Sequence, residues 1–181
     1  MSKNKTKTIK QFIKEAIAIF GNKYDYSKTI YKKSHKKVCI ICHKHGKFKV
    51  TPNNHIVCRQ GCPRCSSSKG EKLIEEYLVK YKIKYTPNKK FIGCKNKKQL
   101  RFDFYLPEYN LCIEFDGMQH FIPFGFGSED KNEKFKRTKI NDEIKNNFCI
   151  RNSIPLLRIP YTKIKGIKKV LDNTFQIFKK I

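Results

Sequence analysis

Two neighbouring stretches of the chain, at 101–106 and 111–116, alternate between apolar and mostly polar residues. In a β-strand, successive side chains point to opposite faces of the sheet. The apolar positions therefore share one face of each stretch: Phe102, Phe104, Leu106, Leu111, Ile113 and Phe115. The intervening sequence Pro-Glu-Tyr-Asn favours a turn. The pattern predicts a hairpin whose other face carries Asp103, Glu114 and Asp116.

Apolar residues at helical spacing mark four other segments. They predict helices over about 9–20, 71–81, 131–148 and 163–179. Two further strands are expected, one within 83–94 and interrupted by Pro87-Asn88, and one at 154–160. From residue 69 onward the order is α, β, β, β, α, β, α, which predicts a mixed β-sheet flanked by helices. The fold class is therefore α+β (mixed α/β).

Two Cys-x-x-Cys motifs lie nineteen residues apart in the first third of the chain. Their cysteines are Cys39, Cys42, Cys62 and Cys65. Two such motifs predict one tetrahedral Zn²⁺ site, and four thiolates close its coordination shell, which favours a structural role. The nearby side chains of His43, His45, His55 and Cys58 are possible substitutes. The polar sequence Ser66-Ser67-Ser68-Lys69-Gly70 then separates an N-terminal helix and zinc-binding module, 1–68, from a second domain, 69–181.

The chain is strongly basic, with 41 Lys and Arg against 15 Asp and Glu among 181 residues and a formal charge of +26. Such a charge favours a polyanionic partner, and nucleic acid is the first candidate. No apolar run approaches the ~20 residues of a membrane span, and the N-terminus lacks the apolar core of a signal peptide. We therefore expect an intracellular protein, in the cytoplasm or nucleus of a host cell, that is not secreted and has no transmembrane segment.

Three carboxylates on one face of a hairpin need a physical reason in so basic a chain. Like charges this close raise one another's pKa unless a cation compensates them. Carboxylate oxygens are ligands that Mg²⁺ and Mn²⁺ prefer. The plainer alternative is a half-buried hairpin whose polar face meets water. Gly117 lets the backbone leave the strand and return Gln119 and His120 toward the carboxylates.

These residues also carry a family resemblance. Asp103, then Glu114-Phe115-Asp116-Gly117, then Gln119-His120 resembles the active-site signature of the PD-(D/E)xK nuclease superfamily. The closest branch is that of very-short-patch-repair endonucleases and related phage and giant-virus homing-type endonucleases. The resemblance implies a restriction-endonuclease-like core over 69–181, with Asp103 and Glu114 binding Mg²⁺. The chain departs from the pattern at the usual lysine position, which is occupied by Asp116.

The resemblance also bears on two helices. It implies that the helix beginning near Glu71 contributes this acidic residue to the site, although a first-turn glutamate is equally explained by the helix dipole. It places an aspartate and a lysine on the helix before the last strand, where Asp142 and Lys145 are spaced to pair with each other. A surface ion pair explains that spacing equally well.

In the N-terminal part, the stretches YDYSKTIY, CHKHGKF and GCPRC follow one another. They resemble a treble-clef-like zinc module found beside nuclease domains of this kind in viral and phage proteins, where it is thought to help hold DNA. Charge and proximity to the cysteine motifs make five residues candidates for phosphate contacts: Lys44, Lys47, Lys49, Arg59 and Arg64. In the second domain, Arg101 and Lys145 are further candidates for contacts with nucleic acid.

The sequence thus predicts a Mg²⁺- or Mn²⁺-dependent endonuclease that cuts DNA, most simply double-stranded, as a monomer or a homodimer. Asp103 and Glu114 would hold the catalytic ion, and Asp116 would hold a second ion or orient water. Gln119 and His120 supply the candidate general acid or base, although His120 is also a possible structural partner of Asp116. Two alternatives remain: a zinc-dependent DNA-binding protein that does not cut, and an RNA-binding or RNA-cleaving protein. A mobile loop rich in phenylalanine, at 121–135, is expected over the site.

Overall fold

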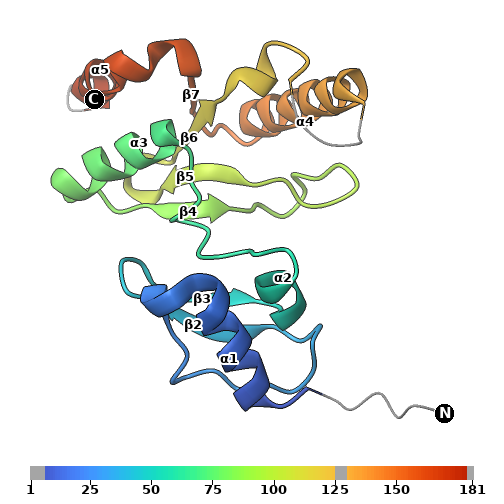
Figure 1. The fold of residues 1–181 in the computed structure, drawn as a ribbon. Helices are drawn as coiled ribbons and strands as arrows, with labels where there is room; N and C mark the ends of the chain where they lie inside the picture. The colour runs from blue at the N-terminus through green and yellow to red at the C-terminus, as the bar shows by residue number, and fades with distance from the viewer. Residues whose placement is uncertain (1–6, 125–129, 179–181) are drawn as a thin grey trace. The chain divides into compact units, whose positions relative to one another are not determined.

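The computed structural model describes residues 7–124 and 130–178 (Figure 1). Between Ser67 and Ser68 the chain divides into two compact units, the N-terminal unit and the C-terminal unit. This division falls one residue before the boundary expected from the polar sequence at 66–70. Within the described residues, no helix is both long enough and apolar enough to cross a lipid bilayer.

The N-terminal unit is a small three-stranded antiparallel sheet with two helices. The strands β1 (Tyr24–Asp25), β2 (Val38–Cys42) and β3 (Gly46–Val50) lie in the order β1-β2-β3. Helix α1 (Ile9–Phe20) begins at a capping box formed by Thr8 and Gln11, whereas α2 (Pro52–Ile56) is a single short turn. The core of the unit consists chiefly of aromatic and β-branched side chains: Phe12, Ala16, Tyr24, Tyr26, Val38, Ile40 and Val50.

The C-terminal unit has a four-stranded mixed sheet in the order β4-β5-β6-β7. The strands are β4 (Thr86–Lys89), β5 (Phe102–Leu106), β6 (Leu111–Asp116) and β7 (Leu156–Pro160). The first three pair antiparallel, and β7 pairs parallel to β6. A parallel neighbour requires a crossover connection, which is the long helix α4 (Lys131–Arg151). Helices α3 (Lys69–Lys80) and α5 (Ile167–Phe178) complete the unit.

The predicted order α, β, β, β, α, β, α is confirmed, and two details differ. Strand β4 continues through Pro87 and Asn88 because it is an edge strand, where a missing amide donor is tolerated. The last predicted helix is divided into a 3₁₀ segment at Tyr161–Gly166 and α5. Shorter 3₁₀ turns follow α1, β5 and β6, at Gly21–Lys23, Pro107–Tyr109 and Met118–His120.

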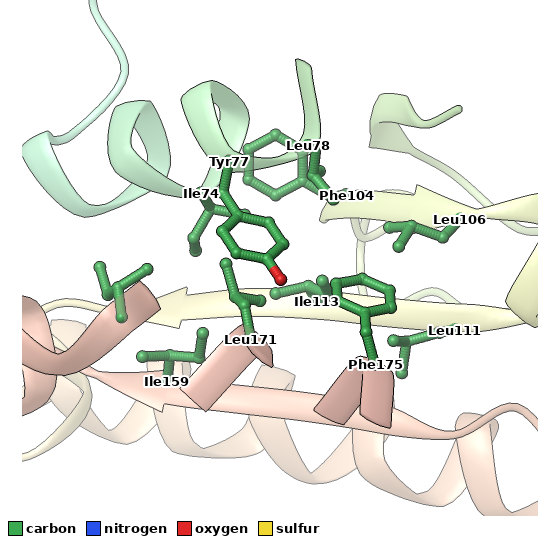
Figure 2. Packing of buried hydrophobic residues seen from close by; sticks show 11 residues of the cluster. Ile74, Tyr77, Leu78, Phe104, Leu106, Leu111, Ile113, Ile159, Leu171 and Phe175 are labelled. Atoms are coloured by element: carbon green, nitrogen blue, oxygen red, sulfur yellow. The ribbon is translucent and has the colours of Figure 1, made fainter. Parts of the chain in front are cut away.

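One face of the mixed sheet packs against α3 and α5. Figure 2 shows Ile74 and Leu78 of α3, with Leu171 and Phe175 of α5, gathered over Ile113 of β6. Helix α3 lies close to the sheet because it carries glycine at position 70. A Cβ atom there would lie 2.2 Å from the ring of Phe115. This contact fixes the start of α3 beside the end of β6.

The other face of the sheet packs against α4 through a second apolar cluster. Its buried members are Cys94, Phe102, Cys112 and Cys149. Phe102 was expected to share a face with Phe104, but it packs in this second cluster at the start of β5. Because Cys112 and Glu114 are two residues apart on β6, Glu114 also points toward the α4 side of the sheet.

Candidate metal centre and acidic cleft

Four potential metal ligands meet in the N-terminal unit: Cys42, His45, Cys62 and Cys65. Their ligand atoms all lie within 4.8 Å of one another. The Sγ atoms of Cys42 and Cys65 are 3.6 Å apart, and His45 Nδ1 lies 3.5 Å from Cys62 Sγ and 3.2 Å from Cys65 Sγ. A tetrahedral Zn²⁺ with Zn–S near 2.3 Å and Zn–N near 2.05 Å would separate its ligands by about 3.6–3.8 Å. The cluster can therefore hold a zinc ion.

Cys39 is not part of this cluster, which corrects the predicted four-cysteine site. Cys39 and Cys42 both lie on β2, where an offset of three residues sends their side chains to opposite faces. Cys42 points inward at the end of the strand. The tight turn into β3 then brings His45 beside it, and Gly46 completes this turn with a φ of +73°. The ligand pattern is Cys-x-x-His followed by Cys-x-x-Cys.

The thiols of the cluster lie so close together that neighbouring thiols affect the pKa of Cys42 and that of Cys65. Burial and the neighbouring thiol of Cys42 raise the pKa of Cys65 to about 11. Burial also opposes ionisation of Cys42, but backbone N–H groups of Lys44 and His45 point at its sulfur and lower the pKa of Cys42 overall. One thiolate is thus favoured and a second is resisted, and a bound divalent cation would remove that resistance.

The other candidate ligands lie elsewhere in the N-terminal unit. His55 is fully buried in an aromatic cage, where its ring stacks on Phe20 at 4.3 Å. His55 Nδ1 lies 2.8 Å from the carbonyl oxygen of Gln60 and therefore carries the hydrogen, so Nε2 accepts from the hydroxyl of Tyr26. His43 and Cys58 are exposed and outside the cluster.

The basic candidates of the N-terminal unit are distributed around this cluster. Lys47 and Lys49 alternate on the outer face of β3, opposite Ile41 and Cys39 of β2. Lys44 is exposed in the turn before β3, and Arg59 is exposed in the segment after α2. Arg64 is half-buried between the last two cysteines. The outer face of this small sheet is therefore basic.

In the C-terminal unit, most of the predicted site residues line a single cleft of about 460 Å³. We call it the Glu114 cleft. The predicted residues in its lining are Glu71, Arg101, Asp103, Glu114, Gln119, His120 and Lys145. They come from α3, β5 and the residue just before it, β6, the turn after β6, and α4. Phe115, Asp142 and Asn141 also contribute to the lining.

Asp103 and Glu114 lie side by side in this cleft, held by reciprocal hydrogen bonds. The backbone N–H of Asp103 donates to Glu114 Oε1, and the backbone N–H of Phe115 donates to Asp103 Oδ2, both at 2.9 Å. Burial, together with the charge of Glu114, raises the pKa of Asp103 to about 7. Burial also raises the pKa of Glu114. A bound cation would therefore stabilise the ionised form of both carboxylates.

Lys145 already supplies one positive charge to the pair. Its Nζ lies 2.5 Å from Glu114 Oε2 and 5.3 Å from the centre of the Phe102 ring, and its side chain is only 12% exposed. The expected pairing of Lys145 with Asp142 does not occur, because α4 presents the two side chains to different strand residues. Lys145 is therefore a cleft residue beside a carboxylate.

Asp116 was predicted on the same face of the hairpin as Asp103 and Glu114, and in the structure it has a different environment. Arg158 of β7 binds both of its carboxylate oxygens at 2.7 Å, and Asp116 is not in the lining of the cleft. Among the described residues, the Cys/His cluster is the only group in which three or more potential ligands meet. In the structure Asp116 is thus engaged in an ion pair, and its role in holding a second ion or orienting water stays a prediction.

A chain of charged groups continues from Arg158 to His120. Arg158 Nη2 donates to Asp142 Oδ1 at 2.8 Å, and His120 Nδ1 lies 2.7 Å from Asp142 Oδ2. Burial alone would raise the pKa of Asp142, but the hydrogen bonds from His120 and Arg158 outweigh burial and lower this pKa. Asp142 therefore stays a carboxylate. Because a carboxylate only accepts, Nδ1 of His120 carries the hydrogen. The partner of His120 is thus Asp142, and Asp116 Oδ1 lies farther away at 3.8 Å.

Glu71 both caps α3 and lines the Glu114 cleft. Its Oε1 accepts from the backbone N–H of Ser68 at 3.1 Å, which closes the capping box of α3. Its side chain also lines the cleft, and its charge contributes to the raised pKa of Asp103.

The phenylalanine-rich segment is only partly defined. Phe121 and Phe124 are 45% and 41% exposed, and the ring of Phe121 lies 5.7 Å from that of Tyr161. Residues 125–129, in the middle of the predicted loop, lie outside the described residues.

One functional candidate, Arg158, was missed in the sequence, and another, His45, was considered only as a substitute ligand, although each had a signal. Arg158 is a charged residue inside an otherwise apolar strand, Leu-Leu-Arg-Ile, which marks a buried ion pair. His45 sits three residues after Cys42 and directly before a glycine, which is the spacing of a metal-binding turn.

Comparison with known protein families gives one match, which lies within the N-terminal unit. Residues 5–66 match a family described as a protein of unknown function, DUF723. The chain is 38% identical over 68 residues to an uncharacterized protein of Acanthamoeba polyphaga mimivirus, covering 38% of the chain and 25% of that protein.

Two further relatives are also uncharacterized viral proteins. One, from Invertebrate iridescent virus 6, is 36% identical over 76 residues, which is 41% of the chain and 36% of the relative. A second mimivirus protein is 35% identical over 101 residues, 55% of the chain and 37% of the relative. The chain thus spans a quarter to little more than a third of the length of these relatives. No solved structure matches the chain significantly.

Proposed function

We propose that the C-terminal unit is a divalent-metal-dependent DNA endonuclease and that the N-terminal unit is a structural zinc module that helps to hold DNA. The observation that carries the proposal is the Glu114 cleft itself. Separate elements bring a buried and a half-buried carboxylate, a lysine and a histidine–aspartate pair into one hollow of about 460 Å³ in a chain of net charge +26. A restriction-endonuclease-like core is the fold that this proposal implies.

The carboxylates of Asp103 and Glu114 are the groups that fit a metal ion. Asp103 and Glu114 present acceptor oxygens in a site whose raised pKa values favour an added cation. With the carbonyl of Phe115 they would hold Mg²⁺ or Mn²⁺. When bound, the ion would lower the pKa of a water molecule and offset charge on the scissile phosphate. Lys145, beside Glu114, adds a second positive charge for the same phosphate.

His120 is the candidate for proton transfer. Asp142 holds its Nδ1–H, so Nε2 is the nitrogen that would exchange a proton with the attacking water or the leaving oxygen. Arg158 keeps Asp142 ionised and in place, and Gln119 lies beside His120 in the lining of the cleft. Replacing His120 with Asn should lower the cleavage rate by roughly 10²–10⁴-fold while leaving DNA binding nearly unchanged.

The decisive experiment is cleavage of supercoiled plasmid by the zinc-loaded protein, with Mg²⁺, with Mn²⁺ and without added divalent metal. Asp103→Asn and Glu114→Gln keep side-chain volume and remove the carboxylate. Glu108→Gln is the matched control, because Glu108 is an exposed glutamate in the turn of the same hairpin. The proposal expects metal-dependent nicking or linearisation that is lost in both cleft variants and kept in the control.

One observation favours a second candidate function, a zinc-dependent DNA-binding protein that does not cut. Lys145 already pairs with Glu114, and Arg158 already pairs with Asp116, so two carboxylates are compensated without a metal. Tight plasmid binding by the wild-type protein, with intact plasmid in both metals, would select this candidate. A matched RNA duplex in the same assay separates either DNA function from action on RNA.

A further inference from the structure

A second hollow of the C-terminal unit lies directly beside the Glu114 cleft. It has a volume of about 690 Å³ and is walled by the segment 96–100 on one side and by the first half of α4 on the other. Four cationic side chains line it: Lys97, Lys98, Lys136 and Arg137. We call it the basic groove. None of these four residues belongs to the metal or proton-transfer groups of the cleft.

The basic groove and the Glu114 cleft are continuous. Gln99, Leu100 and Asn141 line both hollows. The two walls are joined where they meet, because Asn96 Nδ2 donates to Asn141 Oδ1 at 3.0 Å. The segment that carries Lys97 and Lys98 is itself closed by a β-bridge between Lys95 and Gln99. The groove is therefore formed before any ligand arrives.

The charge and polarity of the groove fit a nucleic-acid backbone. Among the described residues that line it, Glu133 is the only acidic one, and it pairs with Lys136 at 2.9 Å. Lys97, Lys98 and Arg137 are exposed. Leu100 and the half-exposed Ile140 place apolar surface between the cations. Alternating cationic and apolar surface suits phosphates and the sugars or bases between them.

We propose that the basic groove binds the sugar-phosphate backbone of the DNA strand that enters the Glu114 cleft. The strand would leave the cleft past Gln99 and Asn141 and run between the 96–100 segment and α4. The course of the strand, from the cleft into the groove, rests on the proposed nuclease function. Binding of DNA in the groove itself requires no cleavage. It adds contacts to nucleic acid that the sequence did not single out.

The test is binding of a 20-base-pair fluorescent DNA duplex to the full-length, zinc-loaded protein without added divalent metal, measured by anisotropy over a range of salt. The groove variant is Lys97→Gln with Lys98→Gln. The matched control is Lys165→Gln with Lys169→Gln, which removes two exposed lysines from the last segment of the same unit. Circular dichroism checks that both variants fold.

For the groove variant we expect weaker binding and a salt slope shallower by about 1.8, because each lost phosphate contact accounts for about 0.9. The control should keep the wild-type slope. Equal losses in both variants, or no loss in the groove variant, would overturn the proposal. Plasmid cleavage by the wild-type protein is measured separately. If the wild type cuts and the groove variant binds DNA normally, the proposed nuclease function stands and the groove proposal is rejected. If the wild type does not cut and only the groove variant loses DNA binding, the groove proposal stands and the nuclease function is rejected.

Discussion

The two units of this protein differ in how they compensate clustered ionisable side chains. In the N-terminal unit, three thiols and an imidazole meet, and burial together with the neighbouring thiol of Cys42 resists the ionisation of Cys65 until a cation joins them. In the C-terminal unit, the carboxylates of Glu114 and Asp116 already have cationic partners, Lys145 and Arg158. From this difference we expect the first site to need a metal in order to fold, whereas the second site is compensated by its own charges.

The largest effect should come from removing a zinc ligand. We expect Cys62→Ser to unfold the N-terminal unit and leave the C-terminal unit intact, because metal binding supplies on the order of 10 kcal/mol in small zinc modules. Zinc content by atomic spectroscopy and limited proteolysis measure the two effects.

The matched control is Cys39→Ser, which replaces a half-buried cysteine on the same sheet outside the cluster. This variant should keep one zinc ion per chain and its resistance to proteolysis. Loss of zinc in Cys39→Ser would contradict the assignment of His45 as the fourth ligand.

The next largest effect tests how much the ion pairs of Arg158 stabilise the C-terminal unit. Replacing Arg158 with Leu leaves Asp116 and Asp142 buried without their cation, which should lower the free energy of unfolding by about 3–5 kcal/mol. Urea unfolding followed by circular dichroism measures it. Arg151→Leu, at the exposed end of α4, should change stability by less than about 0.5 kcal/mol. A small effect at Arg158 would mean that the carboxylates do not depend on it.

A smaller effect is expected where α3 meets the end of β6. Gly70→Ala places a methyl group against the ring of Phe115, and such overpacking costs about 1–3 kcal/mol. Gly166→Ala is the control, because a Cβ atom there meets nothing within 4 Å. Equal unfolding midpoints for the two variants would show that the α3 contact can relax freely.

The smallest predicted effect is a pH dependence of the N-terminal unit. Burial lowers the pKa of His55, so the folded state stays neutral while the unfolded state takes up a proton below about 6.5. Stability is therefore fully present above that pH and falls as the pH decreases, by at most about 1.4 kcal/mol at pH 5.5. Unfolding of wild type and His55→Gln, compared at pH 7.5 and 5.5, measures this contribution. Identical pH dependence in both would contradict it.

The sequence was most informative where one periodicity dominated. Alternation at 101–116 predicted the hairpin of β5 and β6 and the juxtaposition of Asp103 and Glu114, because pairing on one face follows directly from strand geometry. Helical spacing likewise predicted α1, and its end at Gly21 followed from a residue that tolerates positive φ.

The rest of the candidate sites could not be predicted, because it depends on contacts between residues far apart in the sequence. Cys39-x-x-Cys42 reads as a metal-binding loop, but the apolar sequence around it forms a strand, so only Cys42 reaches the metal centre. The partners of Asp142 and Lys145 depend on which face of α4 meets the sheet, and a spacing of three residues along the helix carries no information about that. Asp116 was assigned with the other carboxylates because its partner, Arg158, comes from a strand 42 residues later.

The central claim, that the Glu114 cleft takes a divalent metal independently of zinc, is tested most directly by electron paramagnetic resonance of free Mn²⁺ titrated with the zinc-loaded protein. The account predicts that wild type binds Mn²⁺, that Asp103→Asn abolishes this binding, and that zinc content stays unchanged in both. Unaltered Mn²⁺ binding in Asp103→Asn, or no binding by the wild type at millimolar Mn²⁺, would contradict the claim.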